Sequence, residues 1–124
     1  MIDSDADLEI VAKAVSPEMS SSLRASQSRG GFASFMSKMT LHMYATVWAR
    51  PQMKARDRSL ITVAMLIALR QTNELKPHVK LALTNGVSRE EIEEMVCHAS
   101  AYAGFPAALS AKAAISEALD GVTE

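Results

Sequence analysis

Apolar residues follow two different patterns after a break at Ser26–Gly31, where two glycines and several polar residues carry no period. From Phe32 to Val47 large apolar side chains recur every three or four residues, the spacing of one helix face. From Arg58 to Leu69 apolar residues fall on nearly every side, which is typical of a helix buried all round. In so small a protein we expect other subunits to supply part of that burial.

Capping signals predict two further helices before the break. The first covers residues 3–15, with Asp3 or Ser4 as its N-cap. The second begins at Ser16, which suits an N-cap, and is followed by Pro17, which suits the first helical position. The N-terminus is acidic and lacks the basic region of a signal peptide.

Stop and start signals also organise the C-terminal half. A helix is predicted over Glu74–Thr84, and Asn85-Gly86 supplies a left-handed stop after it. Ser88 and Glu91 then form a capping box that opens the next helix. An alanine-rich helix over about 107–119 follows. No segment has the alternation of a strand, so the sequence predicts an all-α fold of about six helices in one domain, residues 1–124.

Composition excludes several classes of function. The chain has 124 residues, 48% of them hydrophobic, and a formal net charge of −1, so it shows neither the basic excess of a nucleic-acid-binding protein nor a polybasic membrane signal. Its single cysteine rules out an internal disulfide and agrees with a cytoplasmic protein. The three histidines are far apart and lack ligand spacing, so no metal site is predicted.

His78 is the first candidate for chemistry. Pro77 precedes it, and because proline is tolerated in the first turn of a helix, we expect the helix to start between Asn73 and Lys76. The helix dipole favours neutral imidazole there, whereas Glu74, four residues back, favours imidazolium. A histidine under opposing influences suits general acid–base catalysis; the competing interpretation is a surface histidine.

Arginines gather around Pro51, and these are Arg50, Arg56 and Arg58. A guanidinium group matches a carboxylate with two parallel hydrogen bonds, so the cluster is a candidate carboxylate clamp. Arg58 directly precedes the apolar helix, so we expect its side chain to point inward. The competing interpretation is solvated charge, since most surface charges do nothing specific.

Two aromatic residues and one thiol have plainer interpretations. Tyr44 and Trp48 lie four residues apart on one helix face, where core packing or a subunit contact is the leading interpretation. Cys97 lies on an apolar helix and is expected to be buried and inert. His98, beside it, is expected to be a packing residue.

A series of short motifs follows in a fixed order: Trp-x-Arg-Pro, Arg-Ser-Leu, Glu-Leu-x-x-His, Asn-Gly-Val, Glu-Ile and Tyr-x-Gly-x-Pro. In this order they resemble the carboxymuconolactone decarboxylase family over about residues 35–118, and residues 1–31 match it poorly. The resemblance implies an all-α homo-oligomer, a trimer or hexamer. It also implies a lyase of aromatic catabolism (the β-ketoadipate pathway) that releases carbon dioxide from a carboxylated lactone without a cofactor.

The same resemblance implies roles for named residues. His78 is the candidate proton donor, and Glu74 orients it or favours its charged form. Arg50 and Arg58 are the candidates that orient carboxylates. Trp48 and Tyr44 complete the predicted substrate-binding set, beside the packing interpretation given above.

A sister branch of alkylhydroperoxidase-like proteins carries a CxxC pair, whose positions fall here on Gln71 and Glu74. Dithiol peroxidase chemistry is therefore not expected. Where decarboxylase-type sequences commonly have Gly-Glu before Val-Trp, this chain has Ala45 and Thr46, and Pro77 is unusual in its segment. The alternative to a lyase is a non-catalytic oligomeric ligand-binding protein, with a thiol-dependent peroxidase third.

Overall fold

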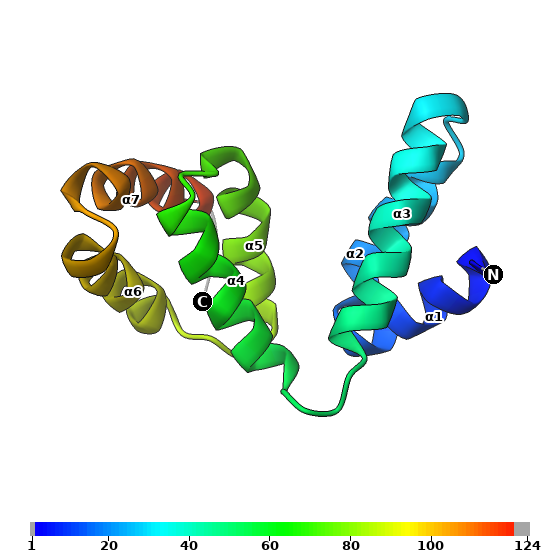
Figure 1. The fold of residues 1–124 in the computed structure, drawn as a ribbon, viewed down its shortest axis with the longest axis horizontal. Helices are drawn as coiled ribbons and strands as arrows, with labels where there is room; N and C mark the ends of the chain where they lie inside the picture. The colour runs from blue at the N-terminus through cyan, green and yellow to red at the C-terminus, as the bar shows by residue number, and fades with distance from the viewer. Residues whose placement is uncertain (1, 121–124) are drawn as a thin grey trace. The chain divides into compact units, whose positions relative to one another are not determined.

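The structure, a computed structural model, describes residues 2–120, and these contain helices and no strand (Figure 1). The all-α prediction is confirmed. In chain order the helices are α1 (Ser4–Ala14), α2 (Pro17–Gln27), α3 (Gly31–Trp48), α4 (Ala55–Ala68), α5 (Thr72–Thr84), α6 (Arg89–Tyr102) and α7 (Phe105–Leu119). Within residues 2–120 no helix has the length and apolar character needed to cross a membrane.

The chain forms two compact units, Met1–Ala55 and Arg56–Glu124. The first contains α1, α2 and α3, and the second contains α4 to α7. A single domain over residues 1–124 stays a prediction.

The two N-terminal helices begin at the caps that the sequence predicts. The side chain of Asp3 accepts hydrogen bonds from the backbone N–H groups of Asp5 and Ala6. The hydroxyl of Ser16 accepts one from the N–H of Met19 at 3.0 Å, with proline in the first turn after it. Each cap satisfies N–H groups that a helix start leaves without a carbonyl partner.

In the first unit the three helices pack pairwise against one another. Two serines join neighbouring helices: Ser20 Oγ donates to the Leu8 carbonyl at 2.8 Å, and Ser37 Oγ donates to the Leu23 carbonyl at 2.7 Å. Both serines are buried, so each hydroxyl needs such a partner. Their small size lets the helices approach closely.

Helix α3 buries one face and exposes another. Leu41, Tyr44 and Trp48 belong to the core. The periodic apolar row noted in the sequence lies on the outside of this unit; its members are Phe32, Phe35, Met36, Met39, Met43 and Val47. This row is a large apolar surface without a partner inside its own unit.

Within the second unit helix α4 is not buried all round, and burial of its remaining side by other subunits stays a prediction. Only Ser59, Val63 and Ile67 of α4 are buried, whereas Met65 is 59% exposed and Leu69, just past the helix, is 68% exposed. The second unit is small, so its core reaches only one side of α4, and the sequence pattern does not say which neighbour covers the other side.

The core of the second unit gathers around α7. Helices α5 and α6 both pack against it. The buried residues of α7 are mostly alanines, which let its neighbours come close. The cluster consists of Val63, Ile67, Leu75, Val79, Ala82, Val87, Ile92, Ala111, Ala114, Ile115, Ala118 and Leu119.

Helices α4 and α5 end in the same way. After α5, the N–H of Val87 donates to the Ala82 carbonyl at 2.9 Å, and Gly86 adopts φ 97° between them. After α4, the N–H of Gln71 donates to the Leu66 carbonyl at 3.0 Å, but the residue with positive φ, 57°, is Arg70. Both are Schellman motifs, and only one of them has the glycine that the conformation favours.

The remaining boundaries follow the predicted signals closely. Ser88 and Glu91 form the expected capping box at the start of α6, with two reciprocal bonds of 3.0 Å. Helix α7 starts at Phe105, two residues before the expected position, because Pro106 fits the first turn.

Candidate functional site

His78 lies on the buried side of α5, next to Leu75 and Val79. Its residue is 9% exposed, so the interpretation as a surface histidine is wrong. The helix starts at Thr72, one residue earlier than expected, which places the exposed Pro77 in the second turn. A proline there cannot donate to the carbonyl four residues back, so α5 lacks one internal hydrogen bond beside His78.

Two effects act in opposite directions on the ionisation of His78. Burial lowers its pKa below the ordinary value of 6.5, and this is the larger effect. The negative charge of Glu74 raises it. Glu74 is exposed and precedes His78 by four residues, so the two share a helix face. The predicted effect of Glu74 is present, whereas the opposing influence is burial and not the helix dipole expected from the sequence.

Arg56 and Arg58 occupy the first turn of α4 and differ in their contacts. The guanidinium group of Arg56 pairs with Glu91, and its other nitrogen lies 3.6 Å from Asp57 Oδ1. Arg56 therefore ties α4 to α6. Arg58 is half-buried, and its carbonyl accepts a hydrogen bond from Thr62 Oγ1 at 2.8 Å. Arg58 remains the candidate for a carboxylate clamp in this unit.

Glu91 is held by two neighbours at once. The pKa of its carboxyl is lowered, first by the hydrogen bond from the Ser88 backbone and then by the hydrogen bond from Arg56. One carboxylate thus caps α6 and connects it to α4. Both roles are structural, which separates Glu91 from the candidate chemistry of His78.

The other predicted site residues lie in the first unit. Tyr44 and Trp48 are buried on α3, with ring centroids 5.8 Å apart and planes at 45°. This tilted contact is a favourable aromatic pair and agrees with the packing interpretation. Arg50 is exposed and follows the end of α3.

The six predicted site residues therefore come from both units. The first unit carries Tyr44, Trp48 and Arg50, and the second carries Arg58, Glu74 and His78. Within the second unit, α5 brings Glu74 and His78 together. The grouping of all six in one site stays a prediction.

Two cavities of the second unit are lined by other residues. One, of about 490 Å³, is an apolar groove between α4 and α6, with the stacked rings of His98 and Tyr102 at its side, 4.9 Å apart. The other, of about 320 Å³, lies between α6 and α7 and includes Cys97. Cys97 is exposed, so its expected burial is wrong. His98 is also exposed, and its ring packs on that of Tyr102.

One polar pair, Asp7 and His42, was not predicted from the sequence. The carboxylate of Asp7 on α1 is 9% exposed, and its Oδ2 lies 2.9 Å from His42 Nδ1 on α3. A signal was present, since Asp7 precedes the apolar Val11 by four residues and so shares its buried face. Nothing in the sequence pairs it with a histidine 35 positions away.

Similar proteins include two curated relatives. The 4-carboxymuconolactone decarboxylase of Acinetobacter baylyi is 39% identical over 80 residues, which cover 64% of this chain and 58% of that protein. Nitrosuccinic acid decarboxylase npaB of Metarhizium robertsii is 40% identical over 68 residues, which cover 55% of this chain and 48% of that protein. The chain thus spans about half the length of the curated relatives it matches.

The comparison with protein families gives one match. Residues 33–117 match the carboxymuconolactone decarboxylase family. The segment runs from α3 through most of α7, so it includes all six predicted site residues and leaves out α1 and α2. Because this segment covers more than half of the sequence, the chain belongs to the carboxymuconolactone decarboxylase family.

Proposed function

We propose that this protein is a decarboxylase that acts on a small carboxylic acid. Its family membership and the names of both relatives support the proposal. A carboxylated lactone is the leading substrate class, and the aromatic catabolism predicted from the sequence would supply it. A cytoplasmic location also stays a prediction.

The two relatives' names indicate what kind of acid is suitable. Nitrosuccinic acid has a nitro group that takes up the electron pair left when carbon dioxide departs. In carboxymuconolactone the lactone carbonyl takes up the pair through a conjugated double bond. Both acids therefore carry their own electron acceptor, and both place negative charge on an oxygen as the carbon–carbon bond breaks. An enzyme for either needs to stabilise that oxyanion and then protonate carbon.

This chain has residues suited to those tasks. In the proposed reaction the imidazolium form of His78 delivers the proton to carbon, and the charge of Glu74 favours that form. Arg58 and Arg50 orient carboxylates, and Tyr44 and Trp48 are the candidate apolar contacts. The substrate holds the electron pair itself, so the proposed reaction needs no cofactor.

One observation carries most of the proposal. His78 is a buried titratable group on the family-matched helix α5, with a carboxylate one turn before it. Burying an imidazole costs free energy, and Glu74 offsets part of the cost of charging it. Such perturbed groups concentrate at functional sites.

We also infer that the protein works as a homo-oligomer. Support comes from the large apolar side chains that each unit leaves outside, such as Phe32 at 81% and Phe35 at 61% exposure on α3. Met65 on α4 is a further case in the second unit. Apolar surfaces of this extent usually mark an interface.

The direct test is release of carbon dioxide from 4-carboxymuconolactone and, separately, from nitrosuccinic acid. We expect turnover of at least one. Binding of both acids without release of carbon dioxide would favour the non-catalytic ligand-binding alternative. Peroxide consumption that disappears in Cys97→Ser would favour the thiol peroxidase.

A further inference from the structure

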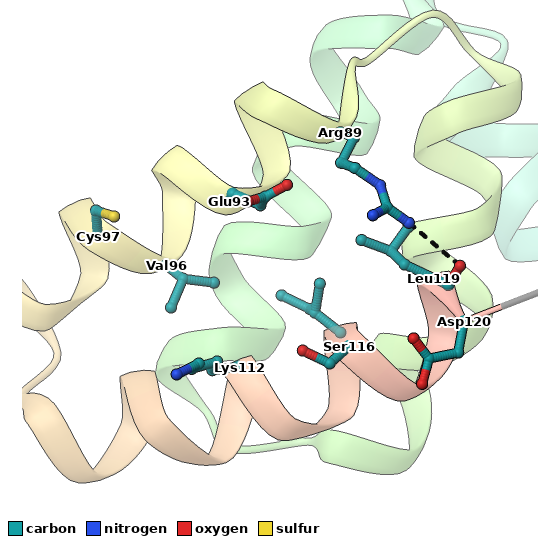
Figure 2. A pocket seen from close by; sticks show the side chains of 9 residues that line it. Arg89, Glu93, Val96, Cys97, Lys112, Ser116, Leu119 and Asp120 are labelled. Atoms are coloured by element: carbon teal, nitrogen blue, oxygen red, sulfur yellow. Dashed lines mark hydrogen bonds between the residues drawn. The ribbon is translucent and has the colours of Figure 1, made fainter. Parts of the chain in front are cut away.

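The cavity between α6 and α7 is a second place where a ligand fits. Its volume of about 320 Å³ lies at the lower end of the range for small-molecule sites. None of the six predicted catalytic and substrate-binding residues lines it. Figure 2 shows side chains of both helices around this space, with α6 on one side and α7 on the other.

The floor of the cavity is apolar and is formed by Val96, Ile115 and Leu119. Ile115 and Leu119 are buried parts of the core, so this floor is fixed by packing. A rigid apolar floor favours a ligand with a compact hydrocarbon group, because burying that group removes it from water.

The rim carries charges of both signs. Lys112 lies toward the Cys97 end, whereas Arg89 and Asp120 lie at the opposite end, and Glu93 is between them (Figure 2). Among residues 2–120, neither Glu93 nor Asp120 forms an ion pair with Lys112. Lys112 and these two carboxylates thus line one small space without pairing with each other.

Arg89 fixes one end of this arrangement. Its Nη2 donates to the carbonyl of Leu119 at 3.2 Å, where α7 ends (Figure 2). The contact neutralises the partial negative charge at the end of α7 and holds the guanidinium group at the rim. The spacing between the rim charges is therefore set by two packed helices.

From this arrangement we propose that the cavity binds a small zwitterion of the amino-acid type, with an apolar side chain. Its carboxylate pairs with Lys112, its ammonium group pairs with Glu93, and its side chain lies on the floor. A zwitterion pairs with both of these exposed rim groups at once, whereas a ligand with one charge pairs with only one of them. This site does not depend on decarboxylation.

Cys97 provides a built-in reporter, since its thiol is exposed and belongs to the cavity wall. The experiment measures the alkylation rate of Cys97 by iodoacetamide in the full chain, with increasing concentrations of leucine. Two analogues that lack one charge each, 4-methylpentanoate and 3-methylbutylamine, serve as comparisons. We expect saturable protection by leucine and at least tenfold weaker protection by either analogue.

Substitutions test which rim groups are used. Lys112→Gln and Glu93→Gln should each weaken protection by leucine at least tenfold, whereas Lys80→Gln, an exposed change on α5, should leave it unchanged. Circular dichroism confirms the fold of each variant. An alkylation rate unaffected by millimolar leucine would overturn the proposal. Equal protection by all three compounds, or protection unchanged in either rim variant, would overturn it as well.

Discussion

Asp7 Oδ2 on α1 and His42 Nδ1 on α3 lie 2.9 Å apart. The carboxylate is buried while the imidazole is 43% exposed, so water reaches mainly the histidine side of the pair. Asp7 is the one carboxylate among the buried residues of the described chain. The pair joins the first helix, which lies outside the family match, to a helix within it.

His42→Ala should therefore destabilise the protein by about 1–3 kcal/mol, because it leaves a buried carboxylate without its partner. Asp7→Asn should lower the free energy of unfolding by a smaller amount, because the amide is neutral and keeps a hydrogen bond to the ring. Urea denaturation measures both. If Asp7→Asn lowered the free energy of unfolding by more than His42→Ala does, that result would contradict this description of the pair.

The two Schellman motifs predict opposite effects on stability. Gly86→Ala should cost about 1–2 kcal/mol, because a side chain is unfavourable at its positive φ although nothing lies within 4 Å of the new Cβ. Arg70→Gly should raise the free energy of unfolding by about 0.5–1 kcal/mol, because it relieves the same strain at the end of α4. Thermal unfolding compares both with the exposed control Thr84→Ala. Stabilisation by Gly86→Ala would show that the turn is not as described.

The pH dependence of activity follows from the two influences on His78. If imidazolium delivers the proton, kcat/KM falls as pH rises through the pKa of His78, which burial places below its ordinary value of 6.5. Because Glu74 raises that pKa, Glu74→Gln should move the midpoint to lower pH. Glu90→Gln, an exposed change on α6, is the control. A midpoint that stays in place or rises in Glu74→Gln would contradict the assigned role.

The same lowered pKa predicts how stability depends on pH. As pH falls below about 6.5, the histidine of the unfolded chain takes up a proton before the buried His78 does. The unfolded state then binds more protons, so the free energy of unfolding decreases as pH falls. His78→Gln should flatten this part of the profile. An equally steep decrease in the variant would assign the effect to other groups.

The apolar row on α3 predicts assembly. Light scattering should give the wild type a mass that is a multiple of the 13.4 kDa chain. Replacing both Phe32 and Phe35 by serine should lower that mass, because these are the most exposed apolar side chains of the row. Lys38→Ser on the same helix is the control. A measured mass of 13.4 kDa for the wild type would contradict the inference of a homo-oligomer.

Local signals in the sequence located most helix boundaries. Asp3, Ser16, Ser88 with Glu91, and Gly86 all act as predicted, because caps and stops depend on the residues next to them. The fold class followed from the same signals and from helical spacing.

Burial was harder to predict because it depends on distant neighbours. The apolar pattern of α4 does not reveal that only one side meets the core, and an apolar setting did not bury Cys97. His78 was identified as a candidate, yet its burial was not foreseen, since the helical spacing of α5 fits a buried or an exposed ring equally well. The spacing of Asp7 and Val11 indicated that Asp7 is buried, but no local signal paired it with His42.

The most direct test of the account is the release of carbon dioxide from 4-carboxymuconolactone by the wild type and by His78→Gln, with circular dichroism confirming that both are folded. General acid–base groups contribute about 10²–10⁴-fold to a rate, so we predict that the wild type turns over and that His78→Gln is at least about 100-fold slower. Turnover by His78→Gln at a rate close to that of the wild type would contradict the central role of His78.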